Sequence, residues 1–442
     1  MRRRITVPSI LDQIVAERRL DSFPEVGELV ASTRSLEASL RQRNFIMECK
    51  SASPSKGVLR ADYRPRELAR IYSQYAGGIS VLCEPRYFGG SYEHLATVAA
   101  STHLPVLCKD FIVLPEQIRA ARYFGADAIL LMLSVLSDDE YRELSALATS
   151  LGLDILTETM SVAEVERAIA LDARIIGINN RNLHDLSVNL DRTRELAPFI
   201  KDRLIVSESG IANYQDVREL SSLVDAFLVG SSLSGETDAD AAVRRLVYGE
   251  NKVCGLTSAG AAQVARAAGA VYGGLIFADS PRQVTVQQAQ EIMRAEPELK
   301  YVVVSRETCE LPGAYAVQLH GPYQGSIEAE LDYVRSQPGR VWRAVDMTRE
   351  GAVDLAITLA PEVDRLILDT GSGGTGATFD WSVIPDDIKH KALLAGGIGL
   401  DNIAEALAVG CAGLDLNSRL ESTPGTKDPH LITAAFHTIA KG

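Results

Sequence analysis

Short apolar runs alternate with helical patterns along most of this chain. Before residue 44, apolar residues such as Ile10 and Leu40 recur at helical spacing, with a break near Phe23 and Pro24. From Phe45 onward, each apolar run is followed by a helical pattern, which is typical of βα units around a parallel sheet. The strands predicted in the first half are 45–50, 79–84, 105–109, 127–133, 153–158, 174–179, 203–208 and 225–230.

A second series of the same kind begins soon after Gly249. Its predicted strands are 252–255, 271–277, 301–304, 314–320, 340–345, 363–369, 391–396 and 412–416. Eight βα units are the content of one closed barrel, so the chain is predicted to be an α/β protein with two tandem (β/α)8 (TIM) barrels. We expect the first barrel at 1–249, with extra helices at its start, and the second at 250–442. The segment between the third and fourth strands of the second barrel is too short for a crossover helix, so that helix is expected to be missing.

Composition narrows the function classes. A net charge of −13 weighs against a general nucleic-acid binder. The six cysteines are scattered without a Cys-x-x-Cys pair, so neither a disulfide framework nor a metal site is predicted. No signal-like or membrane-spanning apolar run is found, and we expect a cytoplasmic protein that does not bind a membrane.

Polar residues close the predicted strands of the first half with unusual regularity. In a barrel these ends meet at the carboxyl-terminal face, where catalytic residues lie. Two lysines and several carboxylates around one mouth suit acid and base roles, although Glu48 and Lys50 alone would equally suit a structural ion pair. Loops that follow strands seven and eight commonly bind phosphate in this fold. The polar strand-end residues are Glu48, Lys50, Glu84, Lys109, Glu158, Asn179, Arg181, Glu208, Ser209, Gly230 and Ser231.

The second half has its own polar strand ends. Cys254 follows the first strand, His320 the fourth and Asp369 the sixth. A cysteine at such a place is more often a small buried apolar residue than a base or nucleophile. The glycine-rich segment 371–376, the glycines at 396–397 and Asn417-Ser418 improve the odds of a functional site, because they place anion-binding loops around the same mouth.

Motifs in both halves resemble those of the bifunctional bacterial tryptophan-biosynthesis family that joins indole-3-glycerol-phosphate synthase to phosphoribosylanthranilate isomerase. The resemblance covers nearly the whole chain. The synthase-like motifs are at 48–55, 107–111, 177–183 and 207–211, and the isomerase-like motifs are at 252–257, 280–282, 318–321, 373–376 and 379–381.

The resemblance implies two reactions on sugar-phosphate substrates, with no metal or organic cofactor. The isomerase half would convert phosphoribosylanthranilate into carboxyphenylamino-deoxyribulose phosphate by an Amadori rearrangement. The synthase half would close and decarboxylate that product to indole-3-glycerol phosphate. A monomer is expected, and contact with other tryptophan-pathway enzymes is left open.

In the synthase half, the resemblance implies that Lys109 is the general acid and Glu158 its acid/base partner at dehydration. Lys50 would hold the substrate carboxylate, with Glu48 and Asn179 positioning the substrate. The implied phosphate ligands are Ser53, Ser209, Gly210, Gly230 and Ser231, and the remaining substrate-binding candidates are Phe88, Phe111, Leu131, Arg181 and Glu208.

In the isomerase half, Cys254 would take the proton from the sugar C2 and Asp369 would protonate the ribose ring oxygen. Arg282 would contact the anthranilate carboxylate. The other substrate or phosphate candidates are His320, Gly374, Gly376, Gly397 and Ser418.

The isomerase half also departs from the family pattern. The segment 258–262 lacks the usual polar residue and aspartate, and Ser305 stands where the family has phenylalanine. An active synthase joined to a degenerate or altered second barrel is therefore the main alternative. A third alternative is a fused pair of sugar-phosphate barrels from another pathway, such as histidine biosynthesis, because fold alone does not define function.

Overall fold

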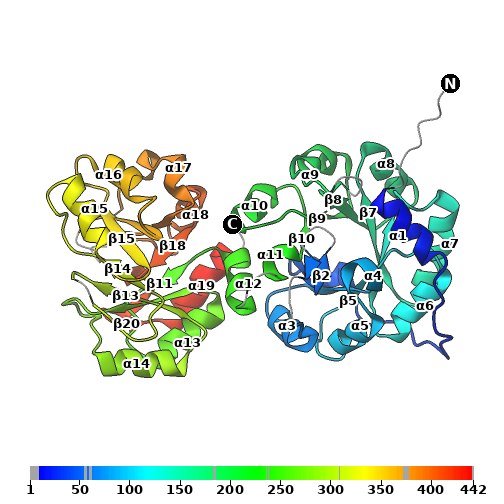
Figure 1. Cartoon of the computed structure of the whole chain (residues 1–442), viewed down its shortest axis with the longest axis horizontal. Helices are drawn as coiled ribbons and strands as arrows, with labels where there is room; N and C mark the ends of the chain where they lie inside the picture. The colour runs from blue at the N-terminus through cyan, green and yellow to red at the C-terminus, as the bar shows by residue number, and fades with distance from the viewer. Residues whose placement is uncertain are drawn as a thin grey trace. The chain divides into compact units, whose positions relative to one another are not determined.

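The computed structural model describes residues 9–53, 57–58, 62–182, 186–234, 236, 238–307, 309–371 and 378–440. The chain forms two compact units, Met1–Val243 and Arg244–Gly442, and the division falls within helix α12 (Ala239–Tyr248). Each unit contains a closed barrel of parallel strands with helices around it (Figure 1). The prediction of two tandem (β/α)8 barrels is confirmed.

In the first unit, every predicted strand is present and each pairs in parallel with its two neighbours. The barrel strands are β1 (Phe45–Cys49), β4 (Gly78–Leu82), β5 (Val106–Lys109), β6 (Ala128–Met132), β7 (Asp154–Thr159), β8 (Ile175–Asn179), β9 (Leu204–Glu208) and β10 (Ala226–Val229). The barrel closes between β1 and β10. A short hairpin of β2 (Ala52–Ser53) and β3 (Gly57–Val58) follows β1.

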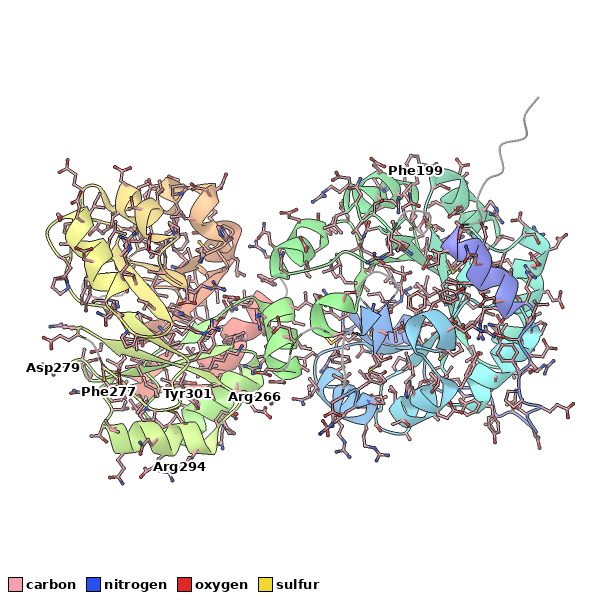
Figure 2. All side chains as sticks on the ribbon, in the orientation of Figure 1. Phe199, Arg266, Phe277, Asp279, Arg294 and Tyr301 are labelled. Carbon is pink, nitrogen blue, oxygen red and sulfur yellow. The ribbon has the colours of Figure 1, made fainter. Side chains whose placement is uncertain are left out.

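Helices cover this barrel, and two of them precede β1 as expected. They are α1 (Ile10–Arg18), α2 (Leu36–Leu40), α3 (Pro65–Tyr72), α4 (Pro85–Phe88), α5 (Tyr92–Ala99), α6 (Pro115–Tyr123), α7 (Asp138–Ser150), α8 (Val162–Ala170), α9 (Asp191–Leu196), α10 (Tyr214–Leu220) and α11 (Ser231–Ser234), with a 3-10 turn η1 (Ala197–Phe199) after α9. Phe199 on this turn is 52% exposed at the outer surface of the unit (Figure 2).

Strand alternation fills the barrel interior. Ile46, Leu107 and Leu130 belong to one buried cluster with Leu156 and Leu228, all from different strands. Alternate residues point away from this cluster toward the helices. Because both faces of each strand are buried, the strands read as nearly continuous apolar runs in the sequence.

The second unit repeats this plan. Its barrel strands are β11 (Lys252–Val253), β12 (Tyr272–Ile276), β13 (Lys300–Ser305), β14 (Ala316–Leu319), β15 (Val341–Asp346), β16 (Arg365–Asp369), β17 (Ala392–Leu394) and β18 (Gly413–Leu416), in sequence order around the barrel. The other elements are α13 (Ala259–Ala268), α14 (Val286–Ala295), α15 (Ile327–Arg335), α16 (Ala352–Leu359), η2 (Trp381–Val383), α17 (Asp386–Lys389), α18 (Ile403–Ala408), η3 (Ser418–Leu420), β19 (Glu421–Thr423), β20 (Thr426–Lys427) and α19 (Pro429–Ile439).

The helix expected to be missing is missing. Between β13 and β14 the described residues, which leave out only residue 308, contain no helix. Val302 points into the barrel core, so its neighbour Val303 points outward, yet Val303 is fully buried. Leu311, in the connection itself, is only 6% exposed. A buried loop residue therefore takes up part of the space where a crossover helix would lie.

Aromatic side chains pack against one another in the core of the second barrel. Trp342 is fully buried, and its ring meets that of Tyr272 edge to face at a centroid distance of 4.8 Å. Tyr272 also contacts Tyr315, at 5.7 Å. Such pairs add directional attraction to the burial of apolar area.

The described residues contain neither a membrane-spanning helix nor a cluster of side chains that could bind a metal ion. Over the ranges described above, no helix is long and apolar enough to cross a membrane. Nor do three or more His, Cys, Asp or Glu side chains come together, within those same ranges, in a way that could hold a metal ion.

Candidate functional sites

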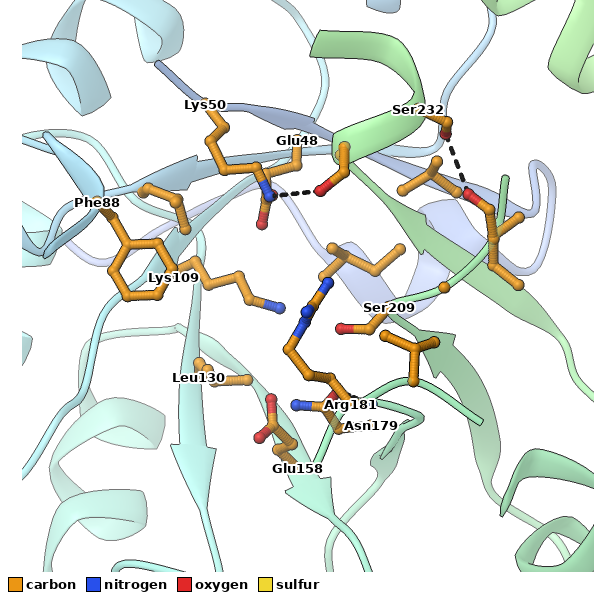
Figure 3. Close-up of a pocket in the computed structure, with 18 of the residues that line it drawn as sticks. Glu48, Lys50, Phe88, Lys109, Leu130, Glu158, Asn179, Arg181, Ser209 and Ser232 are labelled. Carbon is orange, nitrogen blue, oxygen red and sulfur yellow. Dashed lines mark hydrogen bonds and ion pairs between the residues drawn. The ribbon is translucent and has the colours of Figure 1, made fainter. Parts of the chain in front are cut away.

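A cavity of about 720 Å³ lies at the carboxyl-terminal ends of the first barrel's strands. Lys109 from β5 and Arg181 after β8 reach toward its middle, with Lys50 on one side and Glu158 and Asn179 on the other (Figure 3). The predicted residues that line it are Glu48, Lys50, Phe88, Lys109, Phe111, Glu158, Asn179, Arg181, Ser209, Gly210, Gly230 and Ser231. Most of the residues predicted for the first-barrel site therefore line one cavity.

Two lysines in this cavity are held by buried carboxylates. Lys50 Nζ lies 2.6 Å from Glu48 Oε1 and 3.3 Å from Ser231 Oγ. Lys109 Nζ lies 2.6 Å from Glu208 Oε2. Burial opposes the charge of Lys109, but the carboxylates of Glu208, Glu48 and Glu158 outweigh it and raise the pKa of the ammonium. Lys109 is therefore protonated at neutral pH and can donate a proton.

Glu158 is poised differently from its neighbours. Burial, together with the charge of Glu208, raises the pKa of Glu158 to about 7, against the opposing effects of Lys109 and of a hydrogen bond from Asn179. By contrast, the pKa of Glu48 is lowered, because Lys50, Lys109 and Arg181 overcome the effect of its burial. One oxygen of Glu158, Oε1, is buried without a hydrogen-bond partner. A carboxyl group in this state can exchange a proton with a substrate near neutral pH.

The loop after β9 is held in an unusual conformation. Ser209 and Gly210 both have positive φ, 65° and 88°, and serine rarely adopts this region. The fully buried Asn180 holds the loop: its Nδ2 donates to Ser207 Oγ at 3.0 Å and to the carbonyl oxygens of Glu208 and Ser209 at 3.1 Å. Its Oδ1 accepts from the hydroxyl of Thr193 at 2.8 Å. Sequence reasoning did not single out Asn180.

An apolar wall faces the charged groups. Phe88 and Phe111 lie with their rings 5.9 Å apart. Phe88 is fixed by α4, because Glu84 caps that helix by accepting hydrogen bonds from the amides of residues 86, 87 and 88. Glu84 also lines the cavity. Phe88 and Phe111 thus offer a flat apolar surface that suits an aromatic ring.

Two predicted residues differ from expectation, and a third cannot be compared. Leu131 does not line the cavity: its neighbours Leu130 and Met132 do, because alternate residues of β6 point to opposite faces. Glu208 also lies behind the cavity wall and reaches it through Lys109. The side chain of Ser53 lies outside the described residues.

Two glycines make room for carboxylates. A Cβ at Gly230 would overlap the Glu48 carboxylate, and a Cβ at Gly177 would overlap that of Glu208. Gly230 was predicted as a phosphate ligand, and the structure adds this second reason for glycine. The interior apolar residues Leu82, Leu130, Met132 and Leu228 were missed, because an unbroken apolar run does not reveal which residues point inward.

A smaller cavity of about 130 Å³ occupies the corresponding end of the second barrel. The predicted residues that line it are Cys254, Arg282, His320, Asp369, Gly397 and Ser418. Gly374 and Gly376 lie outside the described residues. The cavity is also lined by Gln318 and Asp415, which were not predicted as site residues, and by Asn417, which was expected only as part of an anion-binding loop.

A buried lysine links three strands below Cys254. Lys252 Nζ lies 2.7 Å from Asp415 Oδ2 and 2.7 Å from Gln318 Oε1, and it also bonds the thiol of Cys254. Burial raises the pKa of Cys254, and Lys252 opposes that rise. The sequence signal was present: Lys252 is two residues before Cys254, so both point to the same face of β11.

Asp369 and His320 face each other across this cavity. His320 Nε2 is 3.9 Å from Asp369 Oδ2, and its Nδ1 is 3.2 Å from Gln318 Nε2. Burial raises the pKa of Asp369, although His320 and the amide of Thr370 oppose it. Burial lowers the pKa of His320. A neutral imidazole and a carboxyl that retains its proton more readily are both suited to hydrogen bonding with a sugar.

Arg282 is held at the rim of the cavity. Its Nε and Nη2 each lie 2.8 Å from one oxygen of Glu421. Lys427 bonds the same carboxylate, at 2.6 Å, and also Asn417 Oδ1, at 2.9 Å. This bidentate pair fixes the plane of the guanidinium, and the burial of Glu421 keeps the pair dry.

Each half of the chain matches the model of a different protein family. The family model for indole-3-glycerol phosphate synthase matches residues 7–246, and that for N-(5'-phosphoribosyl)anthranilate isomerase matches residues 251–438. The tryptophan biosynthesis protein TrpCF of Corynebacterium glutamicum is 53% identical over 465 residues, covering 98% of each chain. The protein of the same name from Yersinia pestis is 49% identical over 425 residues, covering 93% of this chain and 88% of its own.

Among solved structures, phosphoribosyl anthranilate isomerase from Thermus thermophilus aligns with 43% of this chain and 98% of its own, at 27% identity and a TM-score of 0.38. The two family models and the relatives that match almost end to end confirm the resemblance seen in the motifs. The chain belongs to the bifunctional family of tryptophan biosynthesis that joins indole-3-glycerol phosphate synthase to N-(5'-phosphoribosyl)anthranilate isomerase.

Proposed function

We propose that the cavity of the first barrel is the synthase site and that Lys109 and Glu158 carry its proton transfers. The observation that carries this proposal is their contrast: a charged ammonium and a carboxyl with a pKa of about 7 face one cavity. In the synthase reaction, the aromatic carbon bearing the carboxylate attacks the ketone carbon. Lys109 gives a proton to the ketone oxygen, and carbon dioxide leaves the ring.

Dehydration completes this reaction. Lys109 first regains a proton from solvent, and the new hydroxyl then leaves as water with that proton while a proton on the adjacent carbon passes to Glu158. Lys50 holds the substrate carboxylate until it leaves, with Glu48 and Asn179 fixing the geometry. Charges held in a partly dry site stabilise the developing oxyanion more than water does.

The remaining proposed contacts are with the phosphate and with the aromatic ring of the substrate. The phosphate is proposed to lie at the loops of Ser209, Gly210, Gly230 and Ser231, with Arg181 nearby. The aromatic ring is proposed to lie on the wall that contains Phe88 and Phe111. The polar and apolar sides of the cavity support this orientation, because a phosphate and an aryl ring at opposite ends match them.

The cavity of the second barrel is proposed as the isomerase site. Asp369 protonates the ring oxygen of the ribosylamine and opens the ring to an iminium. Cys254, as thiolate, then takes the proton from C2, and the C–H electron pair forms the enamine that tautomerises to the ketone. His320 would bind the sugar, Gly397 and Ser418 the phosphate, and Arg282 the anthranilate carboxylate.

A degenerate second barrel is the rival. Its expectation is that Cys254 and Asp369 no longer share a pocket, whereas both line one cavity with Arg282. This arrangement supports an active isomerase despite the altered segment 258–262. The boundary between the catalytic units is proposed at Gly249, between the spans of the two family models.

Steady-state assays of both half-reactions test this assignment. Lys109→Met should lower synthase kcat by about 10³ or more and leave the isomerase unchanged, and Cys254→Ala should do the reverse. The unaffected activity of each variant serves as its folding control. Loss of both activities from either folded variant would contradict separate sites.

The physiological setting is also a proposal. None of the six cysteines forms a disulfide in the part of the chain that the structure describes, which agrees with a reducing, cytoplasmic environment. The chain carries a complete set of site residues for each reaction, so we propose a monomer that works without a partner subunit. Light scattering after size exclusion tests this, because a dimer that dissociates with loss of activity would overturn it.

A further inference from the structure

Lys252 lies at a position where burial makes a charged side chain unfavourable. It is fully buried inside the second barrel, on β11, and Cys254 follows that strand directly. Its ammonium has three partners from three directions: Asp415 on β18, Gln318 on β14 and the thiol of Cys254. An ammonium has three hydrogen atoms to donate, so its hydrogen-bonding capacity is fully used.

The neighbouring strand leaves room for this arrangement. A Cβ at Gly274 would lie 2.7 Å from Cys254 Sγ and 2.9 Å from Lys252 Cε. Either approach is closer than real Cβ atoms make, so only glycine allows both side chains to take their observed places. Well-packed apolar residues usually stabilise a barrel interior at least as well as a buried ion pair. The charge therefore calls for a reason beyond stability.

We propose that Lys252 is a positioning residue of the isomerase site, whose ammonium offsets the burial of Cys254 and stabilises its thiolate form facing the substrate. Asp415 and Gln318 hold the ammonium in place. This inference rests on the proposed role of Cys254 as the base. During the reaction, the C2–H bond breaks and an S–H bond forms, the electron pair reduces the iminium to the enamine, and Lys252 keeps its own proton.

Other charges around the thiol do not replace Lys252. Lys427 lowers the pKa of Cys254, but its ammonium bonds Glu421 and both oxygens of Asn417. Arg282 is bonded to Glu421 in the same way. His320 and Asp369 lie across the cavity and face each other. Asp415 acts in the opposite direction and raises the pKa of the thiol.

The ammonium of Lys252 and the carboxylate of Asp415 act on the thiol in opposite directions, so removing each should have the opposite effect on isomerase activity. Removing the ammonium with Lys252→Met should move the acid limb of the isomerase kcat/KM profile to higher pH. At pH 7 this would lower kcat/KM roughly tenfold or more. Removing the carboxylate with Asp415→Asn should move the same limb to lower pH, because the ammonium then faces the thiolate alone.

The experiment measures this profile in the intact chain, with synthase activity as a control for the preparation. A second readout needs no substrate: the rate at which iodoacetamide alkylates the Cys254 peptide, followed by mass spectrometry as a function of pH. Both readouts should move together in each variant. Lys391→Met is the control, because Lys391 Nζ donates to the carbonyl oxygen of Val363 at 3.0 Å and Lys391 does not line the cavity.

Each outcome decides the proposal. A folded Lys252→Met protein with unchanged profile and alkylation would overturn it, as would shifts in the same direction for both variants. If Lys252→Met fails to fold, Asp415→Asn and the conservative Lys252→Arg still decide, since Arg should keep most of the thiolate reactivity. If Cys254→Ala retains isomerase activity, the role of Cys254 is wrong, and this failure is distinct from that of Lys252.

Discussion

Each cavity contains one acidic group whose pKa is set by a neighbour of defined charge. In the first barrel, Glu158 shares its buried surroundings with Glu208, and this repulsion adds to desolvation. In the second, Cys254 is desolvated but touches an ammonium. The first arrangement favours a neutral carboxyl that can give a proton, whereas in the second the ammonium opposes the rise in the thiol pKa that burial causes, and so eases formation of the anion that can take a proton.

Glu158 should give the first barrel a stability that depends on pH. Its folded-state pKa of about 7 lies above the ordinary glutamate pKa of 4.5, so the folded chain binds the proton more tightly. The stabilising effect is complete below pH 4.5 and is lost as pH rises through 7. Glu158→Gln should therefore raise the free energy of unfolding by ~3 kcal/mol at pH 8, with no gain at pH 4.

Denaturant unfolding at the two pH values, followed by loss of synthase structure, measures this difference. The same variant should lose at least about 10²-fold in synthase kcat, since the acid/base group is gone. Exposed Glu143→Gln is the control and should change stability by less than about 0.5 kcal/mol. A stability gain that is equal at both pH values would show that the carboxyl is not the group responsible.

Individual side chains also mark the limit of sequence reasoning. Lys109 and Glu158 were predictable, because a charge at the end of an apolar strand signals the carboxyl-terminal face. Leu131 was chosen wrongly, because β6 is apolar throughout and the direction of each residue is hidden. Lys252 and Asp415 were missed, because their pairing joins residues 163 positions apart in the chain.

At the scale of elements, β8, α9 and β9 are tied together by Asn180. Its amide bonds the loop that contains Ser209, and its oxygen bonds Thr193 on α9. Asn180→Ala removes these hydrogen bonds from a buried network and should cost about 3 kcal/mol. It should also raise the synthase KM more than it lowers kcat, because the proposed phosphate loop is loosened while Lys109 stays in place.

Synthase kinetics and urea unfolding check this prediction. Asn213→Ala is the matched control: Asn213 caps α10 on the same barrel, so its loss should cost about 1 kcal/mol without changing KM. An Asn180→Ala protein with unchanged KM would mean that the loop keeps its shape without the network.

The connection between β13 and β14 should depend on one apolar side chain. Leu311 is buried in a segment that has no helix to bring apolar residues with it. Leu311→Ala should therefore destabilise the second barrel by about 2 to 3 kcal/mol. Leu400→Ala, at a position 44% exposed, should cost less than about 1 kcal/mol. Unfolding of the isomerase half measures both, and equal costs would show that Leu311 is not a substitute for the absent helix.

All predicted barrel strands are present, because strands buried on both faces produce long apolar runs. Their ends were less accurate. The strand expected to end at Glu84 ends at Leu82, since Glu84 caps α4 instead. Short elements such as α4 and α11 were not predicted, because they depend on local capping contacts rather than on periodicity.

At the scale of the whole molecule, each compact unit has its own closed barrel, its own core and its own cavity. The residues proposed for each reaction come from one unit alone. Such self-containment agrees with the two family models, which match separate stretches of the chain. Effects of the substitutions discussed above should therefore stay within the barrel that carries them.

The aromatic residues of the second barrel provide an optical label for testing this. The chain has two tryptophans, Trp342 in the core and Trp381 on η2, and both belong to the unit Arg244–Gly442. Indole emission changes when a buried ring reaches water, so fluorescence excited at tryptophan should follow unfolding of the isomerase half without any added dye. The synthase half contributes no indole signal, and its unfolding is followed by protease cleavage of its own peptides, read by mass spectrometry, which does not depend on activity.

In a urea titration, Leu311→Ala should lower the urea midpoint of the fluorescence change. The midpoint for unfolding of the synthase half should stay unchanged. Glu158→Gln at pH 8 should do the opposite. A shift of both midpoints by either change would mean that the halves unfold as one cooperative body. Because both indoles lie in one unit, tryptophan fluorescence shows whether the isomerase half unfolds independently of the synthase half.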